Sequence, residues 1–179
     1  MAEQFSNSLL RAVGNVITKT GCTIGAASTE ITVTANTDLE VGQLIDDPRF
    51  LSGTKIHSIL GTTINADRVS TNSIVLNGET VNFLGVATAY TAPIGVKAIL
   101  VGGTFANNKF SQVELTIHVT DSSTGVSAAL ANKIPVPTGS SFVISDAGKT
   151  VIEGNDTIEV YCNSDNAIDV NLSILTGVS

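Results

Sequence analysis

Residues 112–121 read QVELTIHVTD, and their alternation of apolar and polar side chains decides the fold. Successive side chains of a β-strand point to opposite faces, so one face of this segment is apolar and the other is polar. The apolar set is Val113, Leu115, Ile117 and Val119, and the polar set is Glu114, Thr116, His118 and Thr120. The segment therefore predicts a half-buried β-strand.

The sequence on either side of this strand continues the β pattern. Residues 96–106 form an apolar run interrupted by Gly102-Gly103, which indicates a bulge or a close approach. Residues 158–162 and 170–174 each place apolar side chains at alternate positions, and residues 163–166 predict a turn between them. Six to eight strands at spacings near ten residues predict a Greek-key or jelly-roll-like sandwich over residues 86–179.

Shorter strands are expected in the first half of the chain. TEITVTA at residues 29–35 alternates, with Ile31 and Val33 on one face. Asn77-Gly78 lies between two apolar segments and predicts a β-hairpin, because both residues accept positive φ angles. We place a boundary near Val86 to Ala92, ahead of Pro93, which gives a small β-domain with an N-terminal arm at residues 1–85 and a sandwich domain at residues 86–179.

The composition of the chain agrees with an all-β class. Its 179 residues include 19 Val, 17 Ile and 22 Thr, residue types that favour strands. A net charge of -7 argues against a nucleic-acid partner, because phosphate recognition needs clustered Lys and Arg. Aromatic residues make up only 4% of the chain and Trp is absent, which counts against stacking sites for sugars or unpaired bases. No apolar run approaches the roughly 18 residues that span a bilayer, so we expect no membrane partner.

No residue is assigned to a catalytic, cofactor or metal site. His57 and His118 have no partner fixed by sequence, and we expect both at the surface or in an interface. The acidic residues Asp46, Asp47, Asp146, Glu153, Asp156, Asp165 and Asp169 are expected in solvated turns, with a weak calcium site as the alternative. Cys22 and Cys162 are expected as buried free thiols, although a disulfide stays open. We expect no enzymatic activity and no cofactor.

The order of motifs in the second half resembles small β-sandwich virion proteins of tailed bacteriophages. The motifs are YTAPIG at residues 90–95, LTIHVTD at 115–121, IPVPTGSSFVI at 134–144 and VIEGNDTIEVYCNSDNAIDVNLSIL at 151–175. In the motif at residues 134–144, the residues that match the family are Pro137, Gly139, Ser140 and Ser141. In the motif at residues 151–175, they are Gly154, Asp156, Ile158, Asp169, Val170, Leu172 and Ser173. Asn155 departs from the pattern as an extra residue. Residues 41–45 and 53–59 resemble a small β-module that is inserted in phage structural proteins.

This resemblance implies a non-enzymatic component of a bacteriophage virion, assembled in the host cytoplasm. It would be a capsid decoration, neck or collar, or tail-associated protein whose partners are other virion proteins and further copies of itself. The N-terminal segment, with FSNSLL at residues 5–10, would dock on the sandwich or on a neighbouring subunit. The alternative is a receptor- or glycan-binding module of a phage fibre or tip, with a site near Tyr90, Phe110 and Tyr161.

Overall fold

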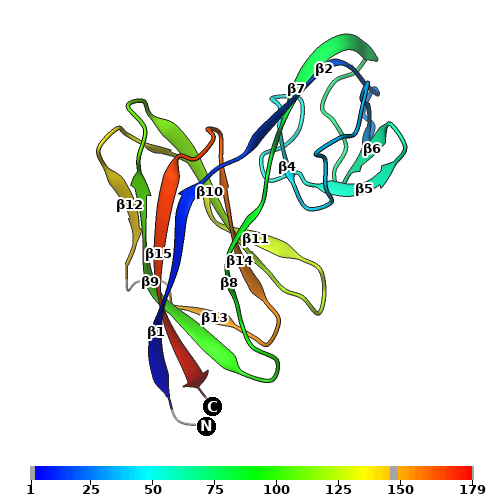
Figure 1. The fold of residues 1–179 in the computed structure, drawn as a ribbon. Helices are drawn as coiled ribbons and strands as arrows, with labels where there is room; N and C mark the ends of the chain where they lie inside the picture. Colours follow the sequence, from blue (N-terminus) through cyan, green and yellow to red (C-terminus); the bar gives the residue numbers. More distant parts are fainter. Residues whose placement is uncertain (1–2, 146–148, 179) are drawn as a thin grey trace. The chain divides into compact units, whose positions relative to one another are not determined.

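The computed structural model describes residues 3–145 and 149–178 as an all-β chain (Figure 1). None of these residues belongs to a helix that is long and apolar enough to cross a membrane. The strands are β1 (Gln4–Val13), β2 (Val16–Ile24), β3 (Glu30–Thr32), β4 (Leu44–Asp46), β5 (Ile56–Leu60), β6 (Thr63–Ala66), β7 (Leu76–Leu84), β8 (Ala87–Thr91), β9 (Lys97–Asn107), β10 (Val113–Thr120), β11 (Ser127–Val136), β12 (Ser141–Ile144), β13 (Thr150–Ile152), β14 (Thr157–Cys162) and β15 (Ile168–Val178).

The chain forms two compact units. The sandwich unit consists of Met1–Gly14 and Ala87–Ser179, and the inserted unit is Asn15–Val86. The sequence places a boundary near residue 86, and the structure divides the chain there as well. It also divides the chain after Gly14, because β1 pairs with β15 of the sandwich unit. The segment that we describe as an N-terminal arm is thus a strand of the sandwich unit.

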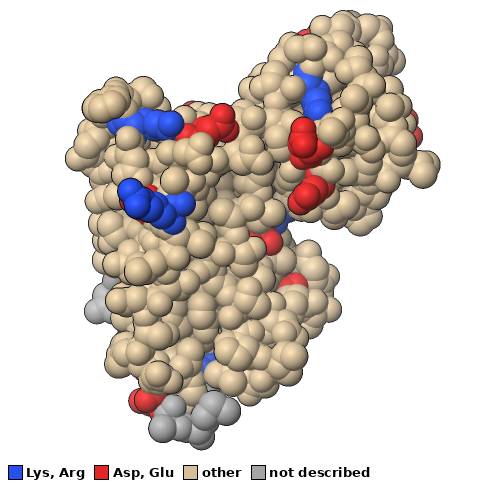
Figure 2. All heavy atoms as spheres, in the orientation of Figure 1, with Lys and Arg blue, Asp and Glu red and all other residues tan. Residues whose placement is uncertain are grey.

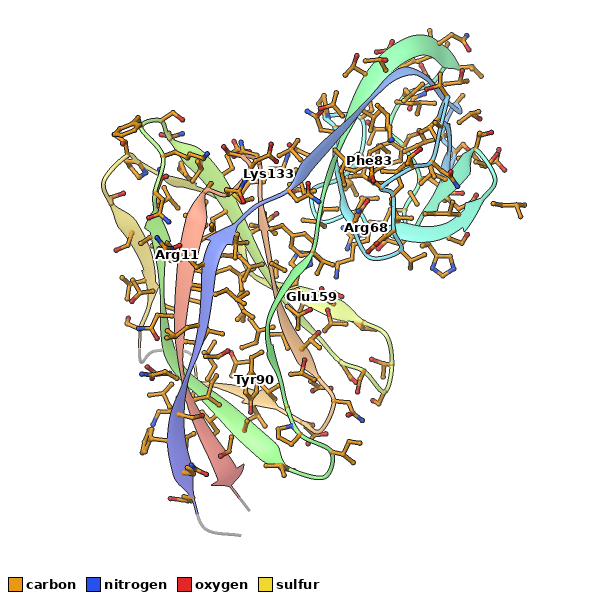
Figure 3. All side chains as sticks on the ribbon, viewed as in Figure 1. Arg11, Arg68, Phe83, Tyr90, Lys133 and Glu159 are labelled. Carbon is orange, nitrogen blue, oxygen red and sulfur yellow. The ribbon has the colours of Figure 1, made fainter. Side chains whose placement is uncertain are left out.

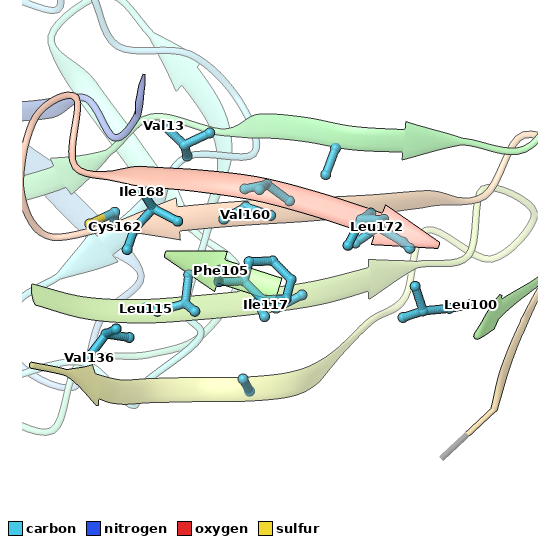
Figure 4. Close-up of a cluster of buried hydrophobic side chains, with 14 of the residues drawn as sticks. Val13, Leu100, Phe105, Leu115, Ile117, Val136, Val160, Cys162, Ile168 and Leu172 are labelled. Carbon is cyan, nitrogen blue, oxygen red and sulfur yellow. The ribbon is translucent and has the colours of Figure 1, made fainter. Parts of the chain in front are cut away.

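Two antiparallel sheets make up the sandwich unit. The first sheet has the order β1-β15-β9-β12, with β13 also paired to β9, and the second has the order β11-β10-β14-β8. Phe105 and Leu172 of the first sheet share a single buried cluster with Leu115 and Val160 of the second (Figure 4). The predicted all-β sandwich is therefore confirmed as a class.

Local sequence explains why these strands face one another. Val113, Leu115 and Ile117 of β10 are buried, as the alternation in residues 112–121 predicts. A bulge lies next to the Gly102-Gly103 pair, because the β9–β15 register shifts between Leu100 and Gly102. A Cβ atom on Gly103 would lie 2.8 Å from Leu172 Cδ2 and 3.2 Å from Phe105 Cε2, so a larger residue here would require these core side chains to shift.

The inserted unit is a six-stranded antiparallel sheet that closes on itself. Its strand order is β4-β7-β2-β3-β6-β5, and Leu44 of β4 forms a bridge with Lys55 just before β5. The sheet encloses a second apolar cluster, which includes Ile31, Val33 and Phe83. At the two ends of this unit the Gly85 N–H donates to the Asn15 carbonyl at 2.8 Å, so the chain enters and leaves at adjacent positions.

A buried ion pair fixes one loop of the inserted unit. Arg49 Nε donates to Asp47 Oδ1 at 2.6 Å, and its Nη2 contacts Asp47 Oδ2. Arg49 Nη1 also reaches Glu79 of β7 at 2.5 Å. The hydrogen bond to Asp47 is the main cause of a raised pKa for Arg49. The guanidinium group therefore ties the loop after β4 to β7.

The Asn77-Gly78 hairpin prediction is wrong. Both residues lie inside β7, a single strand that pairs with β2 and β4. Gly78 has a φ of 77°, and the β2–β7 register shifts between Cys22 and Ile24. The positive φ therefore serves a bulge rather than a chain reversal.

Residues 163–166 do turn the chain, but they lead from the second sheet to the first and form no hairpin.

Candidate interaction surface

The outer face of the first sheet carries a row of apolar side chains across four strands. Phe5 of β1 pairs with Leu175 of β15, Leu175 pairs with Ile99 of β9, and Ile99 pairs with Val151 of β13. Phe5 is 72% exposed and Val151 is 55% exposed. Neighbouring strands lie about 4.8 Å apart, so the row extends over roughly 14 Å of accessible surface.

A second row crosses the same face and is apolar only at its ends. Leu9 of β1, Asn171 of β15, Thr104 of β9 and Val143 of β12 lie side by side in the register. Leu9 and Val143 are exposed, whereas Asn171 and Thr104 supply polar groups between them. Figure 2 shows that the side of the sandwich unit turned to the viewer carries few charged groups. This face therefore combines apolar ends with a polar middle.

A depression of about 420 Å³ lies at the β1 side of this face. Its lining residues are Leu9, Leu10, Arg11, Thr104, Ala106, Asp169, Val170 and Asn171, with Arg11 marked in Figure 3. Asp169 accepts a hydrogen bond at 2.8 Å from the N–H of Ala12, whose φ is 56°. That bond accompanies a register shift between Leu10 and Val13, so the regular part of β1 ends next to the depression.

Polar side chains on the other sheet form a local network. Tyr161 donates its hydroxyl to Glu159 Oε2 at 2.9 Å, and Thr120 Oγ1 donates to the same oxygen at 3.0 Å. The His118 ring meets the Tyr161 ring edge-on at 5.5 Å between centroids. Burial, and then the Glu159 carboxylate, raise the pKa of Tyr161. His57 is exposed as expected, whereas His118 is only 3% exposed, so the expected surface position is wrong for His118.

The expectation that the acidic residues lie in solvated turns is wrong for four of them: Asp46 lies in β4, Asp169 lies in β15, and Asp47 and Asp156 are buried. Asp156 is 8% exposed, and its carboxylate accepts the N–H groups of Ser122 and Glu153, each at 3.0 Å. Asp146 lies outside the described residues. Within residues 3–145 and 149–178, no three His, Cys, Asp or Glu side chains gather into a group that would hold a metal ion.

The two cysteines are free and buried, one in each unit. Burial is the main cause of the raised pKa of both the Cys22 and the Cys162 thiol. Neither thiol therefore favours the reactive thiolate form near neutral pH.

The three aromatic residues of the alternative glycan site differ in accessibility. Tyr161 is fully buried, Tyr90 is half-buried against the sandwich core, and Phe110 is fully exposed. Tyr161 therefore has no surface to offer a sugar.

The residues of the apolar row have no signature in the sequence, because alternation marks the two faces of a strand but not which strands become neighbours.

Comparison with known proteins adds no relative: no family model, curated protein or solved structure matches this chain.

Proposed function

We propose that this protein is a non-enzymatic structural component of a bacteriophage virion that assembles through contacts between subunits. It would act as a capsid decoration, neck or collar, or tail-associated protein. The observation that carries the proposal is the apolar row of Phe5, Leu175, Ile99 and Val151 on a sheet face turned away from the core. Exposed apolar side chains gathered on one sheet face are typical of contact surfaces.

The turn that closes the resembling motif supports the same assignment. A Cβ atom on Gly154 would lie 2.7 Å from the Gly95 backbone nitrogen, which brings the IEGND turn against the PIG segment of residues 93–95. Asn155, the extra residue, has a φ of 73° and accommodates the longer turn. Gly154 and Asn155 therefore act in folding this turn, which leaves the sheet faces and edges for contacts with other subunits.

Association with particles tests this proposal. Phage particles are purified from a lysate by density-gradient centrifugation, and peptides of this chain are quantified against those of the major capsid protein. A fixed ratio that persists through repeated gradients is the expected result. Recovery of the chain only in the soluble fraction would contradict the proposal.

A receptor- or glycan-binding module of a phage fibre or tip is the second candidate function. The depression beside Arg11 favours it, because Asp169, Asn171 and Thr104 supply polar groups next to apolar Leu9. A glycan array and a host-cell binding assay with the full chain test it. Binding that is lost in Asn171→Ala but kept in Thr91→Ala, a change at an exposed position of β8, would support this candidate.

A further inference from the structure

We infer that two copies of this chain pair through β1, antiparallel and about a two-fold axis at Asn7, so that the first sheet continues from one subunit into the other. The inference rests on the proposed function as an assembling protein and names a second copy as the partner. It also specifies which residues meet, and this makes it testable one position at a time.

The first argument is that β1 ends its sheet. It pairs with β15 on one side and stands last in the strand order. In an antiparallel sheet about half of the backbone N–H and C=O groups of an end strand point away from its neighbour. The regular register runs from Gln4 to Leu10, which at about 3.4 Å per residue gives roughly 20 Å of unpaired edge.

The other end strands of the sandwich unit are shorter or interrupted. β11 contains Pro135, which lacks an N–H, and Lys133, which has a φ of 49° beside a register shift. β8 has 5 residues and β12 has 4. Such features prevent pairing between edges, and the regular part of β1 has none of them. Ser8 further fixes β1 in place, because its Oγ donates to the Ala89 carbonyl of β8 at 2.5 Å.

The second argument is that the outer face of β1 is complementary to itself. Its outward side chains are Phe5, Asn7, Leu9 and Arg11, preceded by Glu3. When Asn7 lies opposite Asn7 of the second copy, Phe5 lies opposite Leu9 and Glu3 lies opposite Arg11. Each contact occurs twice because of the two-fold axis. The central Asn7–Asn7 pair is thus flanked on each side by one apolar Phe5–Leu9 pair and one Glu3–Arg11 ion pair.

Other alignments lose this match. A shift by one residue would place outward side chains opposite inward ones, so only even shifts keep the sheet faces continuous. The next alignment in one direction places Phe5 opposite Asn7, and in the other it places Phe5 opposite Arg11. Parallel pairing would bring Glu3 toward Glu3 and Arg11 toward Arg11, and like charges repel. Charge complementarity therefore selects both the antiparallel direction and the register.

Cysteine cross-linking tests the register in the full chain. Directly opposite residues in antiparallel strands have Cβ atoms about 4.5–5.5 Å apart, close to the separation in a disulfide. Asn7→Cys is expected to form a disulfide-linked dimer on mild oxidation. Phe5→Cys is the matched control, because four residues, about 14 Å, separate it from Phe5 of the second copy along the strand. The native thiols Cys22 and Cys162 are buried and do not compete.

Charge exchange provides an independent measurement by sedimentation velocity over a wide concentration range. Arg11→Glu replaces both ion pairs with repulsive pairs and is expected to weaken the dimer roughly tenfold. The double variant Glu3→Arg/Arg11→Glu restores the opposite signs and should recover the wild-type dissociation constant. Lys149→Glu makes the same change of charge at an exposed position just before β13, at the other edge of the sheet, and should have no effect.

A dimer that is cross-linked at position 7, weakened by Arg11→Glu and recovered in the double variant supports the inference. A chain that stays monomeric at every concentration overturns it. An oligomer that ignores both charge variants and cross-links equally through positions 5 and 7 overturns it as well. Particle association is measured separately on purified phage, so either failure leaves the proposed function to its own test.

Discussion

At the residue scale, the two tyrosines report on the integrity of the sandwich unit. Burial raises the pKa of Tyr90, and burial together with the Glu159 carboxylate raises the pKa of Tyr161. The Tyr90 hydroxyl is buried without a hydrogen-bond partner among the described residues. Because the chain contains only 2 Tyr and no Trp, phenolate absorbance isolates these groups.

We expect neither tyrosine to ionise near pH 10 while the sheets remain folded. The folded state holds both phenolic protons more tightly than the unfolded state does, so stability is full below about pH 10 and falls as the pH rises above it. Ultraviolet difference absorbance and far-ultraviolet circular dichroism, followed together during an alkaline titration, check this. The phenolate signal should rise only when the β-sheet signal is lost. A phenolate step in an intact protein would contradict the expectation.

The positions of single side chains show where sequence-based inference ends. Alternation places His118 on the polar face of its strand, and it does lie on that side of β10. Its ring packs edge-on against that of Tyr161, which belongs to β14 and lies 43 positions further along the chain. The same holds for Phe5 and Val151, which join one surface only because β15 and β9 lie between them. No local pattern encodes such partners.

At the element scale, the turn between β13 and β14 requires glycine. A Cβ atom on Gly154 would lie 2.7 Å from Gly95 N and 3.2 Å from Pro93 O, both backbone atoms that have little freedom to move. We expect Gly154→Ala to lower the free energy of unfolding by about 2–3 kcal/mol, measured by urea denaturation. Gly125→Ala is the control, because Gly125 has a φ of 70° but open space around it. The control should cost about 1 kcal/mol, and an equal loss in both variants would exclude the steric explanation.

Regular alternation in the sequence predicts individual strands well, whereas it does not predict their connections. The alternating apolar residues in the sequence predict β10, β14 and β15. In the structure most of these apolar residues are buried. Asn77-Gly78 carries the chemistry of a tight turn, yet β7 continues through it because β2 pairs with Leu76 and Glu79 on either side of the dipeptide. A bulge and a hairpin both need positive φ, so the dipeptide alone does not separate them.

At the scale of the whole molecule, the inserted unit is expected to be removable. The buried cluster of the sandwich unit contains no residue from Asn15–Val86, and the two ends of that segment are joined by the Gly85–Asn15 hydrogen bond. Replacing residues 15–86 with two glycines should leave a protein that unfolds in one cooperative transition with a β-sheet spectrum. Circular dichroism during heating checks this. A chain without sheet structure would show that the sandwich unit depends on the insert.

A core substitution in the shortened chain supplies the matched comparison. Leu172 is fully buried between the sheets, so Leu172→Ala should lower the free energy of unfolding by about 3 kcal/mol in both the full and the shortened chain. Similar losses in the two backgrounds would show that the same core forms in each. A loss confined to the full chain would contradict an independent sandwich unit.

The pairing of β1 with β15 also sets the timing of synthesis. Gln4 and Thr176 form a contact across 172 positions, so β1 is synthesised long before its partner β15. At a translation rate of about 5–20 residues per second, roughly 10–30 s pass between the synthesis of β1 and the synthesis of β15. A chain that ends before Ile168 lacks β15, the strand that joins β1 to β9, and therefore cannot assemble the first sheet. Completion of this sheet thus distinguishes chains that contain β15 from shorter fragments.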